Sequence, residues 1–290
     1  MKRKYPGLLA IIGLAALLYG SFTAQAGILP APATAPPLGT ALPQFGVLGG
    51  AAVTGSTGSG TSVNGDVGSS PTPSITNFPP SLPVPPFIVH RANDAVVQQA
   101  HNDAIAAYNN LAAQGPGTPL GPQLSGVVLT PGLYSFTSTA DLASNGVLTL
   151  NDPTGTGIFV FNVSSALTAN TGSVVVGTAN PCNVYWRVGT SAVLNGNNFF
   201  GTVLADQSVT VASTNNLAGR AVGINGAVTM PGGGGNNIGG CFNGAIVVVP
   251  PGPPPGQGAA GGPTLDSFGL SILLVLLAGA GVLAVNRFTS

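Results

Sequence analysis

Few side chains in this chain could carry acid–base, nucleophilic or metal chemistry, and they are not grouped. Charged residues make up 5% of the 290 residues, whereas ordinary soluble proteins have about 25%. The only histidines are His90 and His101, glutamate is absent, and both lysines lie within the first four residues. The aspartates and the two cysteines are scattered, and no HExxH, nucleophile-elbow or phosphate-loop motif occurs. The sequence therefore predicts a protein that is not an enzyme and that holds no metal and no cofactor.

The overall composition favours short strands joined by turns. The chain contains 44 glycines and 26 prolines and is 44% hydrophobic, while Glu, Lys, Gln and Arg, which favour long helices, are scarce. Small and β-branched residues dominate, as they do in strands. The formal net charge is zero and there is no basic stripe, which argues against nucleic acid as a partner.

Residues 1–26 have the three parts of a secretory signal peptide. Residues 2–4 are positively charged, residues 7–20 form an apolar core, and residues 24–26 form an Ala-Gln-Ala cleavage site. A membrane anchor is the alternative, although the apolar core is short for a span. Export would place the mature chain in an oxidising compartment, where disulfides persist.

The C-terminal end carries a second hydrophobic segment. Residues 250–262 form a Pro/Gly linker, and residues 263–290 combine a Pro-Thr-Leu motif, an apolar span and Arg287. This ending resembles the Pro-Thr-Leu sorting signals of Gram-negative bacteria, although Phe268 stands where tryptophan is more usual. We therefore predict a protein held at the cell envelope or surface, or secreted after processing, that meets a membrane only through this segment. A plain C-terminal membrane anchor is the alternative.

One segment between these two ends reads as a helix. Residues 91–114 contain no Gly and no Pro, and their apolar residues recur at the spacing of one helical face: Val97, Ala100, Ala104, Tyr108 and Leu111. We predict an amphipathic helix of about six turns, with Asn93 or Asp94 in the N-terminal cap or first turn. The preceding residues, 69–90, are too rich in proline for strands and are predicted to form a loop.

A short pattern recurs along residues 38–249, the predicted domain: a small residue, a large apolar residue and usually Thr. It occurs at residues 52–54, 166–168, 192–194, 208–210 and 227–229. Short repeats of this kind suggest a solenoid, in which each coil buries its apolar side chains by stacking on its neighbours. Residues 27–37, which precede the domain, are expected to form a flexible lead-in.

Alternation along each strand predicts one flat outer face. The apolar residue at the centre of each repeat is expected to point inward: Val53, Leu167, Val193, Val209 and Val228. The outward columns are then Ala52, Ala166, Ala192, Ser208 and Ala227; Thr54, Thr168, Leu194, Thr210 and Thr229; and, four residues beyond the inward position, Thr57, Thr171, Asn197, Ser213 and Gly232. Such a face is uncharged and repeats its methyl and hydroxyl groups at the strand spacing of about 4.8 Å.

Four blocks of the sequence resemble the ice-binding-protein family of bacteria, fungi and algae: residues 38–68, 127–142, 182–196 and 217–229. The resemblance implies a mainly β fold, a right-handed discontinuous β-solenoid of triangular section with one long α-helix packed alongside. It also implies a flat ice-binding face rich in Thr, Ser and Ala, which in some members carries Thr-Ala/Gly-x-Thr/Asn. Residues 54–57 and 168–171 match that motif, whereas the third coil departs from it with Leu194 in place of Thr.

We therefore expect the protein to bind ice and its ordered water through the flat face, and to have antifreeze or ice-recrystallisation-inhibiting activity. The alternative is a cell-surface adhesion or matrix module that binds polysaccharide or protein on the same scaffold. Exposed aromatic side chains distinguish the two, because sugar platforms need them. Tyr185 and Trp186 are adjacent in one predicted strand, so one of them must face inward.

Two pairings are also predicted. Cys182 and Cys241 should form a disulfide, because an isolated pair in an exported protein usually bonds; two buried free thiols are the alternative. A second motif also recurs, in which a glycine has a large apolar residue two positions before it and an apolar residue two positions after it. Asp66 and Arg220 each directly follow the glycine of one copy of this motif. These two charges would pair if their coils are neighbours in the solenoid.

Overall fold

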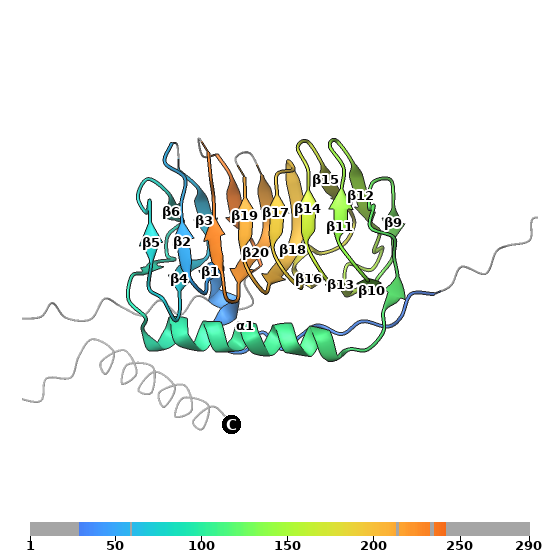
Figure 1. Ribbon diagram of the computed structural model, residues 1–290, viewed down its shortest axis with the longest axis horizontal. Coiled ribbons are helices and arrows are strands. Elements are labelled where there is room, and N and C mark those ends of the chain that lie inside the picture. The colour runs from blue at the N-terminus through green and yellow to red at the C-terminus, as the bar shows by residue number, and fades with distance from the viewer. Residues whose placement is uncertain (1–28, 59, 213–214, 233–234, 242–290) are drawn as a thin grey trace, which may run out of the picture. The chain divides into compact units, whose positions relative to one another are not determined.

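The computed structural model describes residues 29–241, apart from residues 59, 213–214 and 233–234 (Figure 1). The predicted signal peptide, the linker at 250–262 and the C-terminal segment at 263–290 lie outside the described residues. Within the described part of the chain, no helix is both long enough and apolar enough to cross a membrane.

A seven-stranded parallel sheet forms one of three faces around an apolar core. Its strands, in spatial order, are β11 (Ala140–Leu142), β14 (Leu167–Ala169), β17 (Ala192–Leu194), β19 (Val209–Val211), β21 (Ala227–Thr229), β2 (Ala52–Thr54) and β5 (Ile75–Thr76). The outward side of this sheet is called the flat face below.

A fifteen-stranded sheet bends around a corner and supplies the other two faces. The helix face contains β8 (Thr118–Pro119), β10 (Gly132–Phe136), β13 (Phe159–Val163), β16 (Val184–Val188), β18 (Asn198–Ala205), β20 (Asn216–Gly223), β1 (Phe45–Gly49), β4 (Asp66–Ser69) and β7 (Val89–His90). The third face contains β9 (Val128–Leu129), β12 (Val147–Leu150), β15 (Val174–Gly177), the first parts of β18 and β20, β22 (Asn237–Gly239), β3 (Ser62–Asn64) and β6 (Leu82–Pro83).

Strands β18 and β20 belong to two faces because each turns the corner at a glycine. Gly201 (φ 113°) and Gly219 (φ 155°) are register partners. A Cβ atom on Gly219 would lie 1.9 Å from the carbonyl oxygen of Gly201. Only glycine accepts this backbone conformation and this close approach without strain, so these residues allow neighbouring coils to stack at the corner.

The coils are not stacked in chain order, so the solenoid is discontinuous. Strands β2 and β5 come early in the chain but lie beyond β21, the last strand of the seven-stranded sheet along the sequence. The chain winds its first coils toward the β5 end and then runs back along the solenoid through α1 (Ala95–Ala113). Its remaining coils return along the solenoid through β10, β13, β16, β18 and β20 (Figure 1), and β21 then pairs with β2.

Helix α1 buries the side that the apolar spacing predicts. Val97, Ala100, Ala104, Tyr108 and Leu111 are all buried. Asp94 caps the helix, since its Oδ1 accepts hydrogen bonds from the backbone N–H groups of Val96 and Val97. The helix is shorter than the predicted 91–114 because it starts after this cap.

Two apolar clusters hold the fold together. Inside the solenoid, Trp186 stacks on Phe161 with ring centroids 3.9 Å apart and packs at a tilt against Phe199. The second cluster lies between α1 and the helix face and includes Tyr185. Tyr185 and Trp186, neighbours in β16, therefore bury their rings in two different clusters.

Two segments expected to be irregular are more ordered than predicted. In the lead-in, Ala31 forms an antiparallel bridge with Leu133, and the Gln114 side chain bonds both the N–H and the carbonyl of Thr34. The Pro-rich residues 69–90 contain strands β5, β6 and β7, contrary to the loop prediction. Each of these strands has two residues and lies at the end of its sheet, where proline removes few ladder hydrogen bonds.

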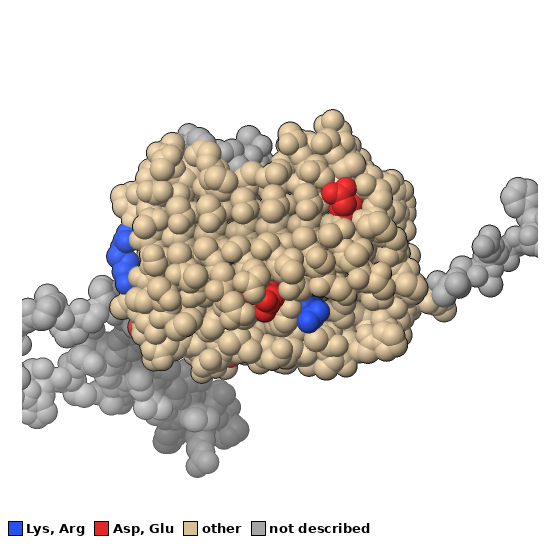
Figure 2. Space-filling view, in the orientation of Figure 1, with Lys and Arg blue, Asp and Glu red and all other residues tan. Residues whose placement is uncertain are grey.

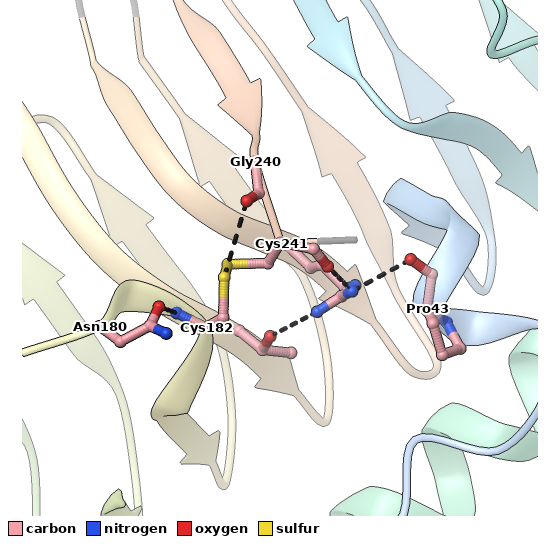
Figure 3. The surroundings of a disulfide bond; sticks show 7 residues. Pro43, Asn180, Cys182, Gly240 and Cys241 are labelled. Carbon is pink, nitrogen blue, oxygen red and sulfur yellow. Dashed lines mark hydrogen bonds between the residues drawn. A yellow bond between two sulfur atoms is a disulfide. The ribbon is translucent and has the colours of Figure 1, made fainter. Parts of the chain in front are cut away.

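The predicted disulfide between Cys182 and Cys241 is present (Figure 3). It joins the short 3-10 helix η2 (Pro181–Asn183) to the end of the described chain, beside the buried side chain of Arg220. Arg220 donates to Thr202 Oγ1 at 3.3 Å, to the carbonyl of Pro43, in the 3-10 helix η1 (Leu42–Gln44), at 3.0 Å, and to the carbonyl of Cys241. Burial lowers the pKa of Arg220 to about 10, so the guanidinium stays charged at neutral pH.

The predicted pair between Asp66 and Arg220 is wrong. Strand β1 lies between β4, which begins with Asp66, and β20, which contains Arg220. The two side chains are therefore more than one strand apart. Asp66 instead accepts a hydrogen bond from the backbone N–H of Ile88 at 2.9 Å and lies 3.3 Å from Nε2 of His90. The first coil does meet late coils on all three faces, because β1 pairs with β20, β2 with β21 and β3 with β22, but Asp66 lies one strand further away, in β4.

Candidate functional site

The outward side chains of the flat face form two rows across the seven strands. The middle row, from the β5 end to the β11 end, is Thr76, Thr54, Thr229, Thr210, Val193, Thr168 and Asp141. The second row, two residues earlier in the sequence at or just before the start of each strand, is Ser74, Ala52, Ala227, Ser208, Ser191, Ala166 and Thr139. All of these side chains are exposed or half-buried, whereas the residues between the rows face the core.

The two rows form a regular grid. Neighbouring strands lie about 4.8 Å apart, and successive outward residues of one strand about 6.6 Å apart. In the described structure, the hydroxyls of Thr168, Thr210 and Thr229 make no hydrogen bond to protein atoms, whereas Thr76 Oγ1 donates to Thr54 Oγ1 at 3.2 Å. Most hydroxyls of the middle row are therefore free to bind water.

The flat face carries almost no charge. Within the two rows of the described structure, Asp141 is the one ionisable side chain. Figure 2 shows a surface from β5 to β11 that is nearly all uncharged. An ordinary soluble β-sheet surface would also carry Lys and Glu, so this composition marks the face as unusual.

Most residues predicted for the first two columns lie in these rows. Ala52, Ala166, Ser208 and Ala227 stand in the second row, and Thr54, Thr168, Thr210 and Thr229 stand in the middle row. The structure thus brings together predicted residues from four repeats that are far apart in sequence. Their contact with a ligand stays a prediction.

The third coil was predicted one residue out of register. Ala192 and Leu194 are 1% and 0% exposed and belong to the core, not to the flat face. Their neighbours Ser191 and Val193 point outward instead, and Val193 is the register partner of Thr168. A shift of one residue exchanges the two sides of a strand, which explains why both assignments failed together.

The third predicted column does not belong to the grid. Thr57, Thr171, Asn197 and Gly232 are exposed, but they lie in turns and bends beyond the strand ends. Ser213 lies outside the described residues. The flat face of the described structure is therefore two rows deep at these strands.

The prediction missed both ends of the face. Strand β5 adds Ser74 and Thr76, and strand β11 adds Thr139 and Asp141. The segment around β5 does carry the recurring pattern, as Ser-Ile-Thr, but it lies within the Pro-rich residues 69–90, whose composition predicts a loop. The segment around β11 ends in Asp rather than Thr and so departs from the pattern.

The two histidines have structural partners away from the flat face. His90 is buried, with Nδ1 2.9 Å from Oδ2 of Asp94 and Nε2 3.3 Å from Oδ2 of Asp66. Burial opposes the charged imidazolium, but the hydrogen bonds to the two aspartates outweigh it and raise the pKa of His90. His101 Nε2 lies 2.8 Å from the carbonyl oxygen of Ile224. The described residues contain no group of three or more His, Cys, Asp or Glu that could hold a metal.

Sequence comparison agrees with this architecture. Residues 47–233 match the family described as ice-binding-like. The chain belongs to the ice-binding-like family. It is 40% identical over 237 residues to an ice-binding protein of Nostoc sp. (strain HG1), a match that covers 79% of this chain and 81% of that protein. The family is non-enzymatic, in agreement with the prediction that this chain is not an enzyme.

Solved structures of the family share the fold. An ice-binding protein from an Antarctic biological consortium is 37% identical, with a TM-score of 0.65 over 73% of this chain and 95% of that chain. An ice-binding protein from Antarctomyces psychrotrophicus is 28% identical, with a TM-score of 0.63 over 73% of this chain and all of that chain. The predicted fold class, a β-solenoid with one helix alongside, is confirmed.

Proposed function

We propose that this protein binds ice and that the flat face is the surface that contacts it. The middle row carries the proposal, because threonines from separate strands stand side by side there with almost no charge near them. Family membership supports the same ligand, since the relatives named above are ice-binding proteins. The protein would then act by adsorption.

The grid can order water in a pattern that the protein itself fixes. Each Thr hydroxyl can hold a water molecule, while the Thr, Ala and Val methyl groups leave neighbouring waters to bond with one another. The β-branch of Thr restricts χ1, and the strand ladder fixes the Cβ positions. The resulting water layer can merge with a growing crystal. Ice that grows between adsorbed molecules becomes curved, which lowers the temperature at which growth continues.

The described structure gives little support to the polysaccharide-binding alternative. Sugar-binding surfaces present aromatic rings, but Trp186 is 0% exposed and Tyr185 is 5% exposed. Neither row of the flat face contains an aromatic residue. The ice-binding proposal explains the uncharged rows, whereas the alternative does not.

The proposal extends to where the protein works. A signal peptide at 1–26 and a sorting or anchoring segment at 263–290 would place the folded part outside the cytoplasm, at the cell envelope or released from it. The Cys182–Cys241 disulfide supports export, because such bonds persist in oxidising compartments. Cell fractionation with and without residues 263–290 tests this location. Protein found in the cytoplasm with both ends intact would contradict it.

The ice-binding proposal is tested on purified chain 27–250, which contains all the described residues. We expect thermal hysteresis, faceted rather than round ice crystals, and slower recrystallisation than in buffer with an inert protein of the same concentration. Crystals that grow round, with no hysteresis and with the protein folded by circular dichroism, would overturn the proposal.

A further inference from the structure

The two ends of the middle row differ in chemistry. At the β5 end the row finishes with Thr76, whose hydroxyl donates to Thr54. At the β11 end it finishes with Asp141, the register partner of Thr168. Beyond Asp141 no further strand of this sheet follows in the described structure; Gln123 forms an isolated parallel bridge with Asp141 instead. A carboxylate thus stands where the other six strands carry Thr or Val.

Two amide side chains hold the Asp141 carboxylate in place. Asn170 Nδ2 donates to its Oδ1 at 2.9 Å, and Gln123 Nε2 donates to its Oδ2 at 3.0 Å. Gln123 is itself fixed, because its Oε1 accepts from the backbone N–H of Ser125 at 2.8 Å. The backbone of Asp141 also bonds the same loop through Leu124 N–H, 2.8 Å away. Asp141 is therefore a rigid, half-exposed charge at the rim of the flat face.

We infer that the cluster of Asp141, Gln123 and Asn170 is the boundary at which the ice-binding area ends, so that β14 is the last strand to contact ice on this side. The inference rests on the proposed function of the flat face. A carboxylate binds several water molecules strongly and in its own geometry, which conflicts with the water pattern set by the Thr row. Removing the charge should extend the ordered layer by one strand, about 4.8 Å.

Asp206 provides a matched control. Its carboxylate accepts from one Asn and one Gln side chain, as that of Asp141 does: Asn225 Nδ2 at 3.0 Å and Gln207 Nε2 at 2.6 Å. It follows the last residue of β18 and lies outside both rows of the flat face. Asp206→Asn therefore removes an equally bonded charge without changing the grid.

The experiment measures thermal hysteresis of chain 27–250 at equal concentration for wild type, Asp141→Asn, Asp141→Thr and Asp206→Asn. We expect both Asp141 variants to exceed wild type, with Asp141→Thr at least as active as Asp141→Asn, and Asp206→Asn to equal wild type. A fourth variant, Thr76→Asp, places a carboxylate at the opposite end and should lower the hysteresis.

The outcomes separate the inference from the proposed function. Wild type without hysteresis would overturn the function itself. An active wild type with Asp141→Asn no better than Asp206→Asn, both folded by circular dichroism, would overturn the boundary. Asp141→Asn keeps the size and shape of the side chain, so it decides the matter even if Asp141→Thr loses its fold. An equal rise in Asp141→Asn and Asp206→Asn would assign the effect to net charge and also overturn the boundary.

Discussion

The flat face and the helix face are built from the same coils, yet their outward side chains differ in size. On the helix face these side chains are large and apolar, and α1 covers them: Leu133, Val160, Tyr185, Leu204 and Val222. On the flat face they are Ala, Ser, Thr, one Val and, at the rim, Asp141, and none is covered by another element of the described structure. The helix face therefore stabilises the fold through buried apolar side chains, whereas the flat face stays exposed and can contact water and ice.

On the helix face, buried polar side chains also hold α1 to the neighbouring segments through hydrogen bonds. Asp103 of α1 is buried, and its Oδ2 accepts from the backbone N–H groups of Ala41 and Leu42 at 2.8 and 3.3 Å. At the helix start, His90 joins Asp94 to Asp66 of β4. On the described flat face, the side-chain hydrogen bonds are those of Asp141 at the rim, the Thr76–Thr54 bond, and the bonds that Ser191 and Ser208 accept from backbone N–H groups. Substitutions on the two faces should therefore affect different properties.

The largest effect is expected from a bulky charge in the centre of the flat face. Thr210→Arg should abolish thermal hysteresis, because the guanidinium would both separate the grid from ice and bind water in its own geometry. Thr168→Lys should act in the same way. Thr210 is half-exposed, so the free energy of unfolding should change by less than about 0.5 kcal/mol.

Asn109→Arg is the control for Thr210→Arg. Asn109 is exposed on α1, so the variant gains the same side chain away from the grid. Its hysteresis should match wild type. If Thr210→Arg kept wild-type hysteresis and an unchanged melting curve, the flat face would not be the ice-binding surface.

Shortening a buried side chain on the helix face should have the opposite effect: it should lower stability and leave thermal hysteresis unchanged. Leu204 is 0% exposed beneath α1, and Leu204→Ala should lower the free energy of unfolding by about 2–5 kcal/mol through lost burial and a cavity. Hysteresis per folded molecule should be unchanged, because no residue of the grid moves. Urea unfolding and hysteresis measured on one preparation would check this. Loss of hysteresis in a fully folded Leu204→Ala protein would mean that the two faces are not independent.

A smaller effect is expected when the pH is changed, because the free energy of unfolding depends on the protonation of His90 and Asp94. The pKa of His90 is raised in the folded state, so its contribution to stability is complete below its unfolded pKa of about 6.5. That contribution is lost as the pH rises through the higher, folded value. The pKa of Asp94 is lowered despite the opposing effect of burial, mainly by its hydrogen bond to His90, so the Asp94 contribution is lost only in acid, below its ordinary range.

Urea unfolding between pH 5.5 and 9 isolates the His90 contribution. Stability should fall across neutral pH in wild type, and His90→Gln should flatten that fall. The other groups that face His90 are Asp66 from β4, Asp94 at the helix cap and the ring of Phe45 from β1. An identical slope in His90→Gln would assign the pH dependence to another group.

Local patterns predict the repeating parts of this fold well. The helix and the repeats ending at Thr54, Thr168, Thr210 and Thr229 could be located because apolar and small residues alternate clearly in each. The disulfide followed from an isolated cysteine pair in an exported chain. These features depend on neighbours in sequence or on simple chemistry.

Features set by contacts between distant segments could not be predicted. In the third coil three apolar residues follow one another, Ala192, Val193 and Leu194, so either register satisfies the pattern, and stacking against β14 and β19 decides it. The predicted pairing of Asp66 with Arg220 is wrong because β1 lies between the strands that carry them. Strand β5 could not be predicted because the surrounding residues are rich in proline. Proline is tolerated there because β5 lies at the end of its sheet.

The smallest effect is expected at Val193, the one apolar member of the middle row. Val193→Thr would place a hydroxyl between those of Thr168 and Thr210 and make the row threonine from β14 to β5. We expect a slight rise in thermal hysteresis, because one more water site joins an existing pattern. The free energy of unfolding should change by less than about 0.5 kcal/mol, since the side chain is half-exposed.

Leu194→Thr is the matched variant that sharpens this prediction. It makes the adjacent residue Thr, but at a position that is 0% exposed and faces the core. A buried hydroxyl without a partner costs about 1–3 kcal/mol in proteins, and lost apolar volume adds to that. Leu194→Thr should therefore destabilise the protein and leave the hysteresis of the folded molecules unchanged. The reverse result, a stable Leu194→Thr with altered hysteresis beside a destabilised Val193→Thr, would restore the register expected from the Ala-Val-Leu pattern and move the flat face by one residue in this coil.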